Sequence, residues 1–511
     1  MTKTNTSFSR RFITVLGSPA FFWAILAFLV LQAAWIALSG RYPMAFDEDF
    51  HLGIIRLYAH HLGPFWGGQP ANADMFGAVA RDPSYLYHFL MSFPYRLISV
   101  FTNDQTIQVL ILRTINIGLF AGALALYRRL MLKTGVSKAL VHCCLLVFVL
   151  VPIVPFLAAQ INYDNLFLPA TALALLLAVR FDTVLAKQKR LDAKTILQLL
   201  IVCLLASLVK YAFLPVFAAI AVFVIVRAWQ SRRVAPKKLW RSLATSWQAL
   251  SGWLRLGLVV ALILSAGLFV ERYGVNLVRY HEPVPDCSKV LTVKQCSAFG
   301  AWVRDYDYEA ANVHGPRSPV SFTREWLYGM WLRTFFAVGG SGTDFETRGP
   351  LLVPSLGVII LAGASVLAVP AAARRLLKRY NAPVLWLFFM AAASYIGILW
   401  LDEYKAFLHT GHPVAINGRY LLPVLLPVLL IAAAAVNELI KQKQALRLVI
   451  ASAAILCFAW GGGTLTFILR SDDAWYWPSP AARTANHAVQ RVLGPVTPGY
   501  IYKTQFLRTG V

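Results

Sequence analysis

The sequence predicts an all-α protein that crosses a membrane many times. Apolar residues make up 58% of the chain and charged residues 14%, and the mean hydropathy is +0.60. The chain also contains a series of apolar stretches of about 20 residues, the length that crosses a hydrocarbon core roughly 30 Å thick. Because soluble domains carry about 25% charged residues, this composition indicates a protein whose surface is largely solvated by lipid.

About eleven transmembrane helices are expected from the apolar stretches. These stretches lie near residues 18–39, 107–127, 139–158, 165–184, 196–226, 257–272, 351–370, 383–400, 419–437 and 448–468. The fifth is too long for one crossing and is interrupted at Lys210-Tyr211, so we expect two short crossings that meet at the outer face. The first follows basic residues but is too long for a typical signal core, which predicts an uncleaved anchor.

The net charge of +25 reflects membrane topology rather than binding to nucleic acid. Basic residues gather in the short segments that alternate with the spans, as expected for loops that stay in the cytoplasm. Of the 23 acidic residues, only Asp182, Asp192 and Glu438 fall on or beside that side. We therefore expect an integral protein of the bacterial inner (plasma) membrane with its N terminus in the cytoplasm, and no nucleic-acid partner.

Three polar regions are expected outside the membrane, and they define the domain organisation. We expect a transmembrane domain over residues 1–472, with a first outer loop at 40–106 and a large outer loop at 273–350, followed by an outer tail at 473–511. The large loop is rich in Tyr, Asp, Gly and Pro and has no regular pattern, which is typical of a lid or a binding element.

Two features of these loops need a separate argument. The segment 84–101 is apolar enough to span, but Pro94 and Arg96 interrupt it and an extra crossing would invert every later loop against the charge rule. We expect it to lie along the outer interface. Cys287 and Cys296 share the large loop, where they either form a disulfide in an oxidising compartment or remain free thiols, because proximity in sequence does not guarantee the geometry of a bond.

The most informative polar residues are three consecutive carboxylates, Asp47, Glu48 and Asp49, which follow the first apolar stretch. A carboxylate at the membrane surface can take a proton from an acceptor hydroxyl. His51 lies four residues after Asp47 and shares its helix face, so a divalent metal is left open, although no spacing typical of a zinc site occurs and no metal is assigned. The alternative is that these acids only complement the positive end of a helix.

Three further motifs lie at the expected outer ends of spans. Asn162-Tyr163-Asp164 opens the fourth span, Lys210-Tyr211 lies at the break, and Gly418-Arg419-Tyr420-Leu421-Leu422-Pro423 opens the tenth. The cations suit a lipid phosphate, because a guanidinium fork holds two oxygens at once.

Each of these polar positions also has a purely structural alternative. Asn162 and Asp164 can cap a helix, Lys210 can snorkel to the interface, and Arg419 can pair with Asp402 or Glu403 in the same loop. Arg81-Asp82, in the first outer loop, either helps to shape a sugar pocket or belongs with the interfacial aromatic run that follows it.

Phe46-Asp47-Glu48, with His51 following, resembles the acidic first-loop motif of the GT-C superfamily of membrane glycosyltransferases. With the three other motifs in register, nearly the whole chain is similar to the domain-of-unknown-function 2142 group within that superfamily. The resemblance implies a GT-C-like fold, Asp47 as the catalytic base and Glu48 as a residue that orients the acceptor or a metal. The common pattern has a proline just before the acidic pair, whereas this chain has Phe46 there and a third acid, Asp49, which leaves the choice among the three carboxylates open.

The resemblance implies a glycosyltransferase that moves a sugar directly, with inversion, from a polyprenyl-phosphate donor to a hydroxyl of a glycan, lipid or protein at the outer face. Membrane lipids are the other expected partners, and no cofactor is assigned. The candidate substrate-binding residues are Asp49, His51, Arg81, Asp82, Asn162, Asp164, Lys210, Tyr211, Arg419 and Tyr420. The alternatives are a glycan polymerase or ligase that uses a diphosphate-linked lipid, a lipid or sugar transporter, and a non-enzymatic assembly subunit.

Overall fold

A computed structural model describes residues 11–44, 47–232, 236–311, 318–335, 352–441, 443–470 and 473–493. Over these residues the chain is all-α, apart from isolated β-bridges such as the one between Gly40 and Tyr476. The α-helices are α2 (Pro19–Ser39), α3 (Glu48–Ala59), α4 (Leu86–Phe101), α5 (Gln105–Leu132), α6 (Lys138–Leu150), α7 (Ile153–Ala158), α8 (Asp164–Gln188), α9 (Ala193–Val209), α10 (Leu214–Arg232), α11 (Pro236–Gln248), α12 (Gly252–Phe269), α13 (Val275–Tyr280), α14 (Cys287–Val290), α15 (Val293–Cys296), α16 (Gly300–Ala310), α17 (Pro319–Phe335), α18 (Leu352–Arg379), α19 (Ala382–Thr410), α20 (Leu422–Leu439), α21 (Gln444–Gly461), α22 (Gly463–Arg470) and α23 (Pro480–Leu493). Short 3-10 turns are η1 (Asp74–Phe76), η2 (Tyr211–Phe213), η4 (Gly418–Leu421) and η5 (Asp473–Trp475), and η3 (Val270–Gly274) is a π-helix.

The prediction of an all-α membrane protein with many spans is confirmed. Within the described residues, nine helices are long and apolar enough to cross a membrane, and α6 and α9 are shorter apolar helices. The break expected at Lys210-Tyr211 is present, because α9 ends at Val209 and η2 begins at Tyr211. The number of crossings remains a prediction.

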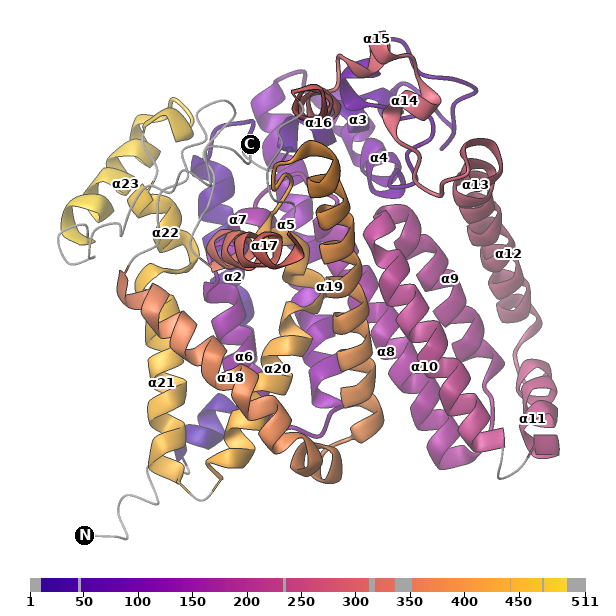
Figure 1. Ribbon diagram of the computed structural model, residues 1–511, viewed down its shortest axis with the longest axis vertical. Coiled ribbons are helices and arrows are strands. Elements are labelled where there is room, and N and C mark those ends of the chain that lie inside the picture. The colour runs from indigo at the N-terminus through magenta and orange to yellow at the C-terminus, as the bar shows by residue number, and fades with distance from the viewer. Residues whose placement is uncertain are drawn as a thin grey trace.

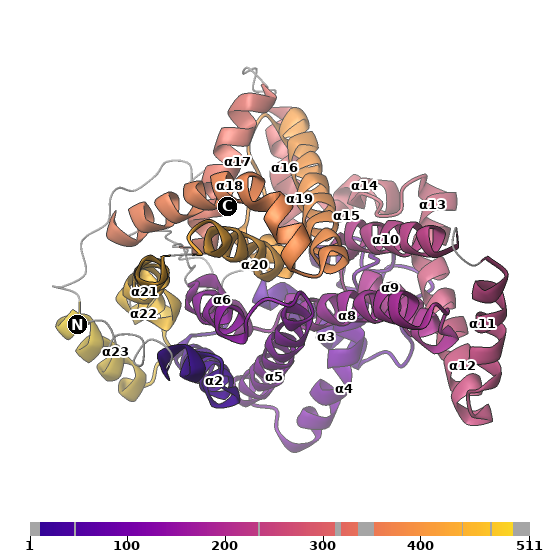
Figure 2. The ribbon, with the colours of Figure 1, turned by 90° about the horizontal axis from the view of Figure 1, so that it is seen from below.

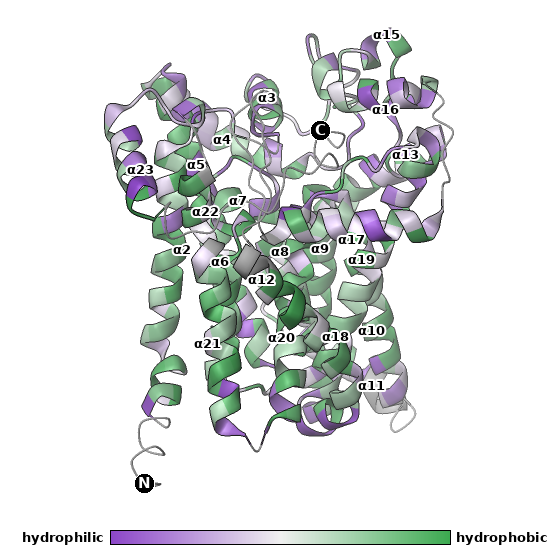
Figure 3. Cartoon of the chain, turned by 60° about the vertical axis from the view of Figure 1, so that its left-hand side comes forward, coloured by the Kyte–Doolittle hydropathy of each residue, from purple (hydrophilic) through white to green (hydrophobic). Residues whose placement is uncertain are grey.

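The long helices run side by side, and the short polar helices gather at one end (Figure 1). We call this end, which carries α3, α4 and α14 to α16, the loop end. Colouring by hydropathy shows apolar residues along the length of the bundle and polar residues at its two ends (Figure 3). Viewed from below, α11 and α12 lie at the edge of the molecule (Figure 2), where α12 packs against α9.

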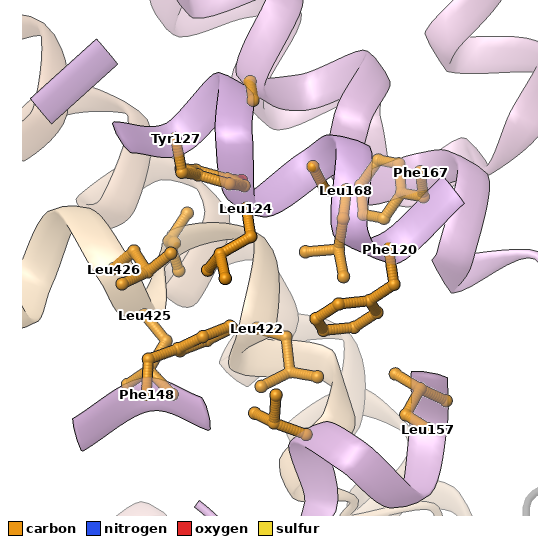
Figure 4. Close-up of a cluster of buried hydrophobic side chains, with 14 of the residues drawn as sticks. Phe120, Leu124, Tyr127, Phe148, Leu157, Phe167, Leu168, Leu422, Leu425 and Leu426 are labelled. Carbon is orange, nitrogen blue, oxygen red and sulfur yellow. The ribbon is translucent and has the colours of Figure 1, made fainter. Parts of the chain in front are cut away.

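The buried core joins helices from distant parts of the sequence. Phe120 and Leu124 of α5 and Phe167 of α8 pack together with Leu422 and Leu425 of α20 (Figure 4). In the same layer, the hydroxyl of Tyr127 donates to the carbonyl of Pro423 over 2.6 Å. Since α5, α8 and α20 are fixed against one another here, the polar residues at their ends are held in a constant arrangement.

The three acidic residues that depart from the charge rule all have partners. Asp182 pairs with Arg227, and Glu438 pairs with Arg379 over 2.7 Å. Asp192 accepts a hydrogen bond from the backbone N–H of Thr195 at the start of α9. These acids therefore neutralise a neighbouring cation or cap a helix.

The large loop differs from the expectation in its helical content, whereas segment 84–101 agrees with it. The described part of the large loop is mostly helical, because α13 to α17 lie within it, and α17 lies across the bundle rather than along it (Figure 1). Cys287 and Cys296 form a disulfide.

Segment 84–101 forms α4, which is not among the candidate spans, and the guanidinium of Arg96 donates to carbonyls at the end of α3, including those of Tyr58 and His61. Residues 336–350 and the end of the tail, 494–511, lie outside the described residues.

Candidate functional site

Glu48 is a fully buried anchor of the first outer loop. Both of its carboxylate oxygens accept from the guanidinium of Arg113 in α5, at 2.8 and 2.7 Å, and both side chains are 0% exposed. The same carboxylate also accepts the backbone N–H groups of Met44 and Ile161. Arg113 donates in turn to the carbonyls of Ala37 and Gly40. The pair therefore ties the first outer loop to α5 and to the segment before α8.

Asp47, one residue earlier, is in a very different environment. Its side chain is 58% exposed and lies 2.6 Å from the guanidinium of Arg419. Its backbone has φ 69°, in the left-handed region, and its side chain makes no capping hydrogen bond to α3. A non-glycine residue rarely adopts this conformation, and such strained positions cluster at functional sites. Asp47 and its two acidic neighbours lie at the start of α3, so the alternative that they complement the positive end of a helix stays open.

Arg419 reaches Asp47 because η4 is packed closely against α17. A Cβ atom on Gly418 would collide with the backbone nitrogen of Thr334, so glycine is required for this approach. Asn417 Oδ1 accepts the backbone N–H of Arg419 over 3.1 Å and fixes the turn. The two acids that we considered as partners lie in α19 rather than in a loop, and Glu403 accepts instead from the indole N–H of Trp326.

Lys210 is buried at the break between α9 and η2. Its ammonium lies 2.7 Å from Asp164 Oδ1 and faces the rings of Tyr163 at 4.4 Å and Tyr420 at 4.8 Å. Since Lys210 is only 4% exposed, it does not snorkel to the interface. Asn162 Oδ1 accepts the backbone N–H of Asp164, the first residue of α8, and the carboxylate of Asp164 contacts Lys210.

His51 completes the group through a contact that the sequence did not indicate. Its Nδ1 lies 2.9 Å from Nε2 of His88 in α4, and its ring packs edge to face with Tyr163 at 4.6 Å. Burial lowers the pKa of His88 to about 3. Burial, followed by the electrostatic interactions of the ring with His88, Arg419 and Lys210, also holds the pKa of His51 well below its usual range. Both imidazoles are therefore neutral.

These contacts link residues from five separate segments into one group at the loop end. We call it the charged cluster; its members are Asp47, His51, His88, Tyr163, Asp164, Lys210, Arg419 and Tyr420. The ring of Tyr420 joins its two cations, because it lies 4.8 Å from Lys210 and 5.2 Å from Arg419.

The other candidate residues have contacts elsewhere. Arg81 donates to Glu271 over 2.9 Å and to Asn276 over 2.8 Å, so it secures the first outer loop to η3 and α13. Asp82 accepts the backbone N–H of Ser84. The backbone N–H of Tyr211 donates to the hydroxyl of Ser84, and Asp49 is exposed.

Two arginines beside the charged cluster were not among the site residues predicted from the sequence. Arg113 lies inside an apolar span, where a charge requires a partner, and this requirement was the available signal for its pairing with Glu48. Arg333 in α17 donates to the carbonyl of Ile416, and burial lowers its pKa to about 10. No sequence pattern marks Arg333, because its proximity to Arg419 depends on how α17 lies across the bundle.

A metal site is not formed by the described residues, since no three His, Cys, Asp or Glu side chains gather among them. His51 Nδ1 is already engaged by His88, so Asp47 and His51 do not form a ready pair of ligands. The fold and the site define a polytopic all-α membrane protein with a charged cluster at one end of its bundle. No protein-family model, curated protein or solved structure matches the chain.

Proposed function

We propose that this protein is a GT-C-type glycosyltransferase that moves a sugar from a polyprenyl-phosphate donor to a hydroxyl acceptor at the outer face of the membrane. The observation that supports this function best is the contact between Asp47 and Arg419, with Lys210 in the same charged cluster. A carboxylate base and two cations are the groups that transfer from a lipid phosphate requires.

Each of the three residues has one role in the proposed reaction. Asp47 accepts the proton of the acceptor hydroxyl as the hydroxyl oxygen attacks the anomeric carbon. The bond from that carbon to the phosphate oxygen breaks, and its electron pair leaves with the phosphate, whose charge Arg419 and Lys210 stabilise. Direct displacement inverts the anomeric centre.

The ion pair between Asp47 and Arg419 suggests how donor binding prepares the base. A phosphate offers Arg419 a bidentate partner, so donor binding draws the guanidinium away from Asp47 and leaves the carboxylate available to the acceptor. Glu48 and Asp164 are assigned positioning roles, because their carboxylates are buried against Arg113 and Lys210. Asp47 is thus the proposed base among the three adjacent acids.

Two observations support an outer location for the charged cluster. The basic residues concentrate on the other side of the spans. The disulfide between Cys287 and Cys296, a bond typical of oxidising compartments, lies in the same region as α3, since Phe299 stacks against Phe50 at 6.1 Å. We also infer that the chain makes about eleven crossings and has the GT-C architecture. Its N terminus would then lie in the cytoplasm of a bacterium.

A second candidate, a glycan polymerase or ligase that uses a diphosphate-linked lipid, is favoured by Arg333. This buried arginine is close enough to Arg419 for the two charges to influence each other, and a second phosphate would use the additional cation.

Reconstitution separates these two functions. The purified full chain in lipid vesicles would be supplied with matched polyprenyl monophosphate and diphosphate sugars, with acceptors chosen from mass spectra of surface glycans that differ between cells with and without the protein. Product from the monophosphate alone supports the proposed function, and product from the diphosphate alone supports the second candidate. Identical surface glycans in the two cell types, with no product from either donor, would exclude both.

A further inference from the structure

The tail helix α23 is docked beside the loop end of α2, a candidate membrane span. The indole N–H of Trp35, in the last turn of α2, donates to Asn486 Oδ1 of α23 over 3.1 Å. The backbone N–H of Trp477 donates to the carbonyl of Ser39, the last residue of α2. Because Trp35 lies one turn before that end, α23 is held about 6 Å from it along the helix axis. The helix therefore lies beside the bundle at the depth expected for lipid headgroups (Figure 1).

The side chains of α23 are distributed as in a helix that lies flat on a membrane. Arg483, His487 and Arg491 recur every four residues and form a basic stripe along one face. On a different side of the helix, Ala488 is exposed and Val492 is 71% exposed. The helix contains no acidic residue. Interfacial helices combine these two features, a basic face toward the headgroups and an apolar face toward the acyl chains.

A cavity of about 410 Å³ adjoins the basic stripe and is lined by His487, Gln490 and Arg491. Its volume falls within the range of small-molecule sites. The side-chain amide of Gln490 donates to the carbonyl of Ile468 in α22 over 2.6 Å. The cavity therefore lies where α23 is fastened to α22, rather than on a free end of the tail.

The charges around this cavity leave one cation for a ligand. His487 Nε2 lies 2.7 Å from Asp473 Oδ1, so its ring already has an acidic partner. The guanidinium of Arg491 is exposed and has neither an ion-pair nor a hydrogen-bond partner among the residues that the structure describes. Guanidinium groups hold phosphate through two parallel N–H groups.

We propose that α23 binds the headgroup of an anionic glycerophospholipid, with the phosphodiester on Arg491 in this cavity and the acyl chains in the bilayer beside the bundle. Depth, a cavity and an unpaired cation together specify this ligand, because basic pockets at the membrane surface attract anionic lipids. The site is independent of the proposed sugar transfer, since it shares no residue with the charged cluster. It gives the tail a function of its own, which is to fix the protein to a particular lipid.

Photocrosslinking of the full chain tests this site directly. The protein is placed in nanodiscs of phosphatidylcholine that contain a small fraction of phosphatidylglycerol with a photoreactive headgroup, and labelled residues are located by mass spectrometry. We expect label on residues 480–493, displaced by unlabelled phosphatidylglycerol but not by additional phosphatidylcholine. Absence of label from α23, or equal displacement by the two lipids, would overturn the proposal without any variant.

A pair of arginine variants then tests the role of Arg491. Arg491→Gln removes the phosphate fork at an exposed position that needs no repacking, and we expect the label on α23 to fall about 3-fold to 10-fold. Arg279→Gln, at an exposed arginine of α13, removes the same charge elsewhere at the loop end and should stay within about 2-fold of wild type. Equal losses in the two variants would show that net charge, rather than this cavity, attracts the lipid, and would exclude the site.

Discussion

Asp47 and Arg419 are 372 residues apart in the sequence, yet their side chains form an ion pair 2.6 Å long at the loop end of the bundle. The pair is asymmetric, since the carboxylate is 58% exposed and the guanidinium side chain is 5% exposed. An incoming anion would therefore gain a desolvated arginine, and an incoming hydroxyl would meet an accessible carboxylate. This asymmetry is the basis of the proposed division of roles.

Replacement of Asp47 tests its role as the base. Asp47→Asn keeps the shape of the side chain but cannot accept a proton, so we expect sugar transfer to fall about 10²-fold to 10⁴-fold while the protein remains folded. Asp49→Asn is the matched control, because Asp49 is exposed and lies outside the charged cluster, and its rate should stay close to wild type. Full transfer by Asp47→Asn in the reconstituted assay would remove Asp47 from the mechanism.

The buried pair of Glu48 and Arg113 predicts an effect on stability. Glu48→Gln or Arg113→Leu leaves one charge buried without its partner, which costs about 3–5 kcal/mol. The double variant Glu48→Gln with Arg113→Met has no buried charge and should recover part of this loss. Unfolding midpoints in detergent measure both effects. A Glu48→Gln protein of unchanged stability with no transfer activity would instead identify Glu48 as the base.

The helices could be predicted from the sequence, whereas the partners of the buried charges could not. Apolar length is a local property, so most predicted spans fall on one long helix, although 139–158 is divided between α6 and α7 and 448–468 between α21 and α22. Arg419 appeared closest to Asp402 and Glu403 along the chain, but α19 carries those acids and the observed partner comes from the first outer loop. Proximity in sequence says little about proximity in space once the chain returns many times through the same bundle.

The histidine pair shows the same difference between pattern and contact. His88 belongs to an aromatic run that fits an interfacial belt equally well, and only the packing of α4 against α3 brings its ring to His51. In contrast, the sequence did restrict the cysteines to two alternatives, and the structure has the disulfide.

The same pair makes stability depend on pH. In the folded protein both imidazoles are neutral, since burial lowers the pKa of His88 to about 3 and holds that of His51 well below its usual range. In the unfolded chain each titrates near pH 6.5. Their contribution to the free energy of unfolding is therefore complete above about pH 6.5. It is lost as the pH falls, because the unfolded state then binds more protons than the folded state. Together the two residues add up to about 2.7 kcal/mol per pH unit to the slope of the free energy of unfolding against pH.

His88→Phe removes one of the two titrating imidazoles and should halve the contribution of the pair to the slope of the free energy of unfolding against pH. The measurement compares unfolding of the two proteins in one detergent from about pH 7.5 to about pH 4.5. Slopes that do not differ would show that His88 is not held neutral in the fold.

Gly418 sets the position of Arg419 and predicts a sensitive backbone site. Gly418→Ala would place a Cβ against the backbone of Thr334, which forces η4 away from α17 and costs about 1–3 kcal/mol. We expect transfer activity to fall together with the unfolding midpoint. Gly397→Ala in α19 is the control, because a Cβ there meets open space and alanine is favoured over glycine in a helix by about 0.5–1 kcal/mol. Normal activity in Gly418→Ala would show that the rate of transfer does not depend on the position of η4.

The disulfide allows the proposed orientation of the protein to be tested in cells. If the loop end faces outward, a membrane-impermeant maleimide added to intact cells should label Cys287 and Cys296 only after treatment with a reductant. The four free cysteines would first be replaced by alanine: Cys143, Cys144, Cys203 and Cys457. Lys187→Cys, an exposed position near the opposite end of α8, serves as the control and should react only after the membrane is permeabilised. The reverse pattern, with Lys187→Cys labelled in intact cells and the disulfide protected, would place the charged cluster in the cytoplasm, where the compartment does not favour the observed bond.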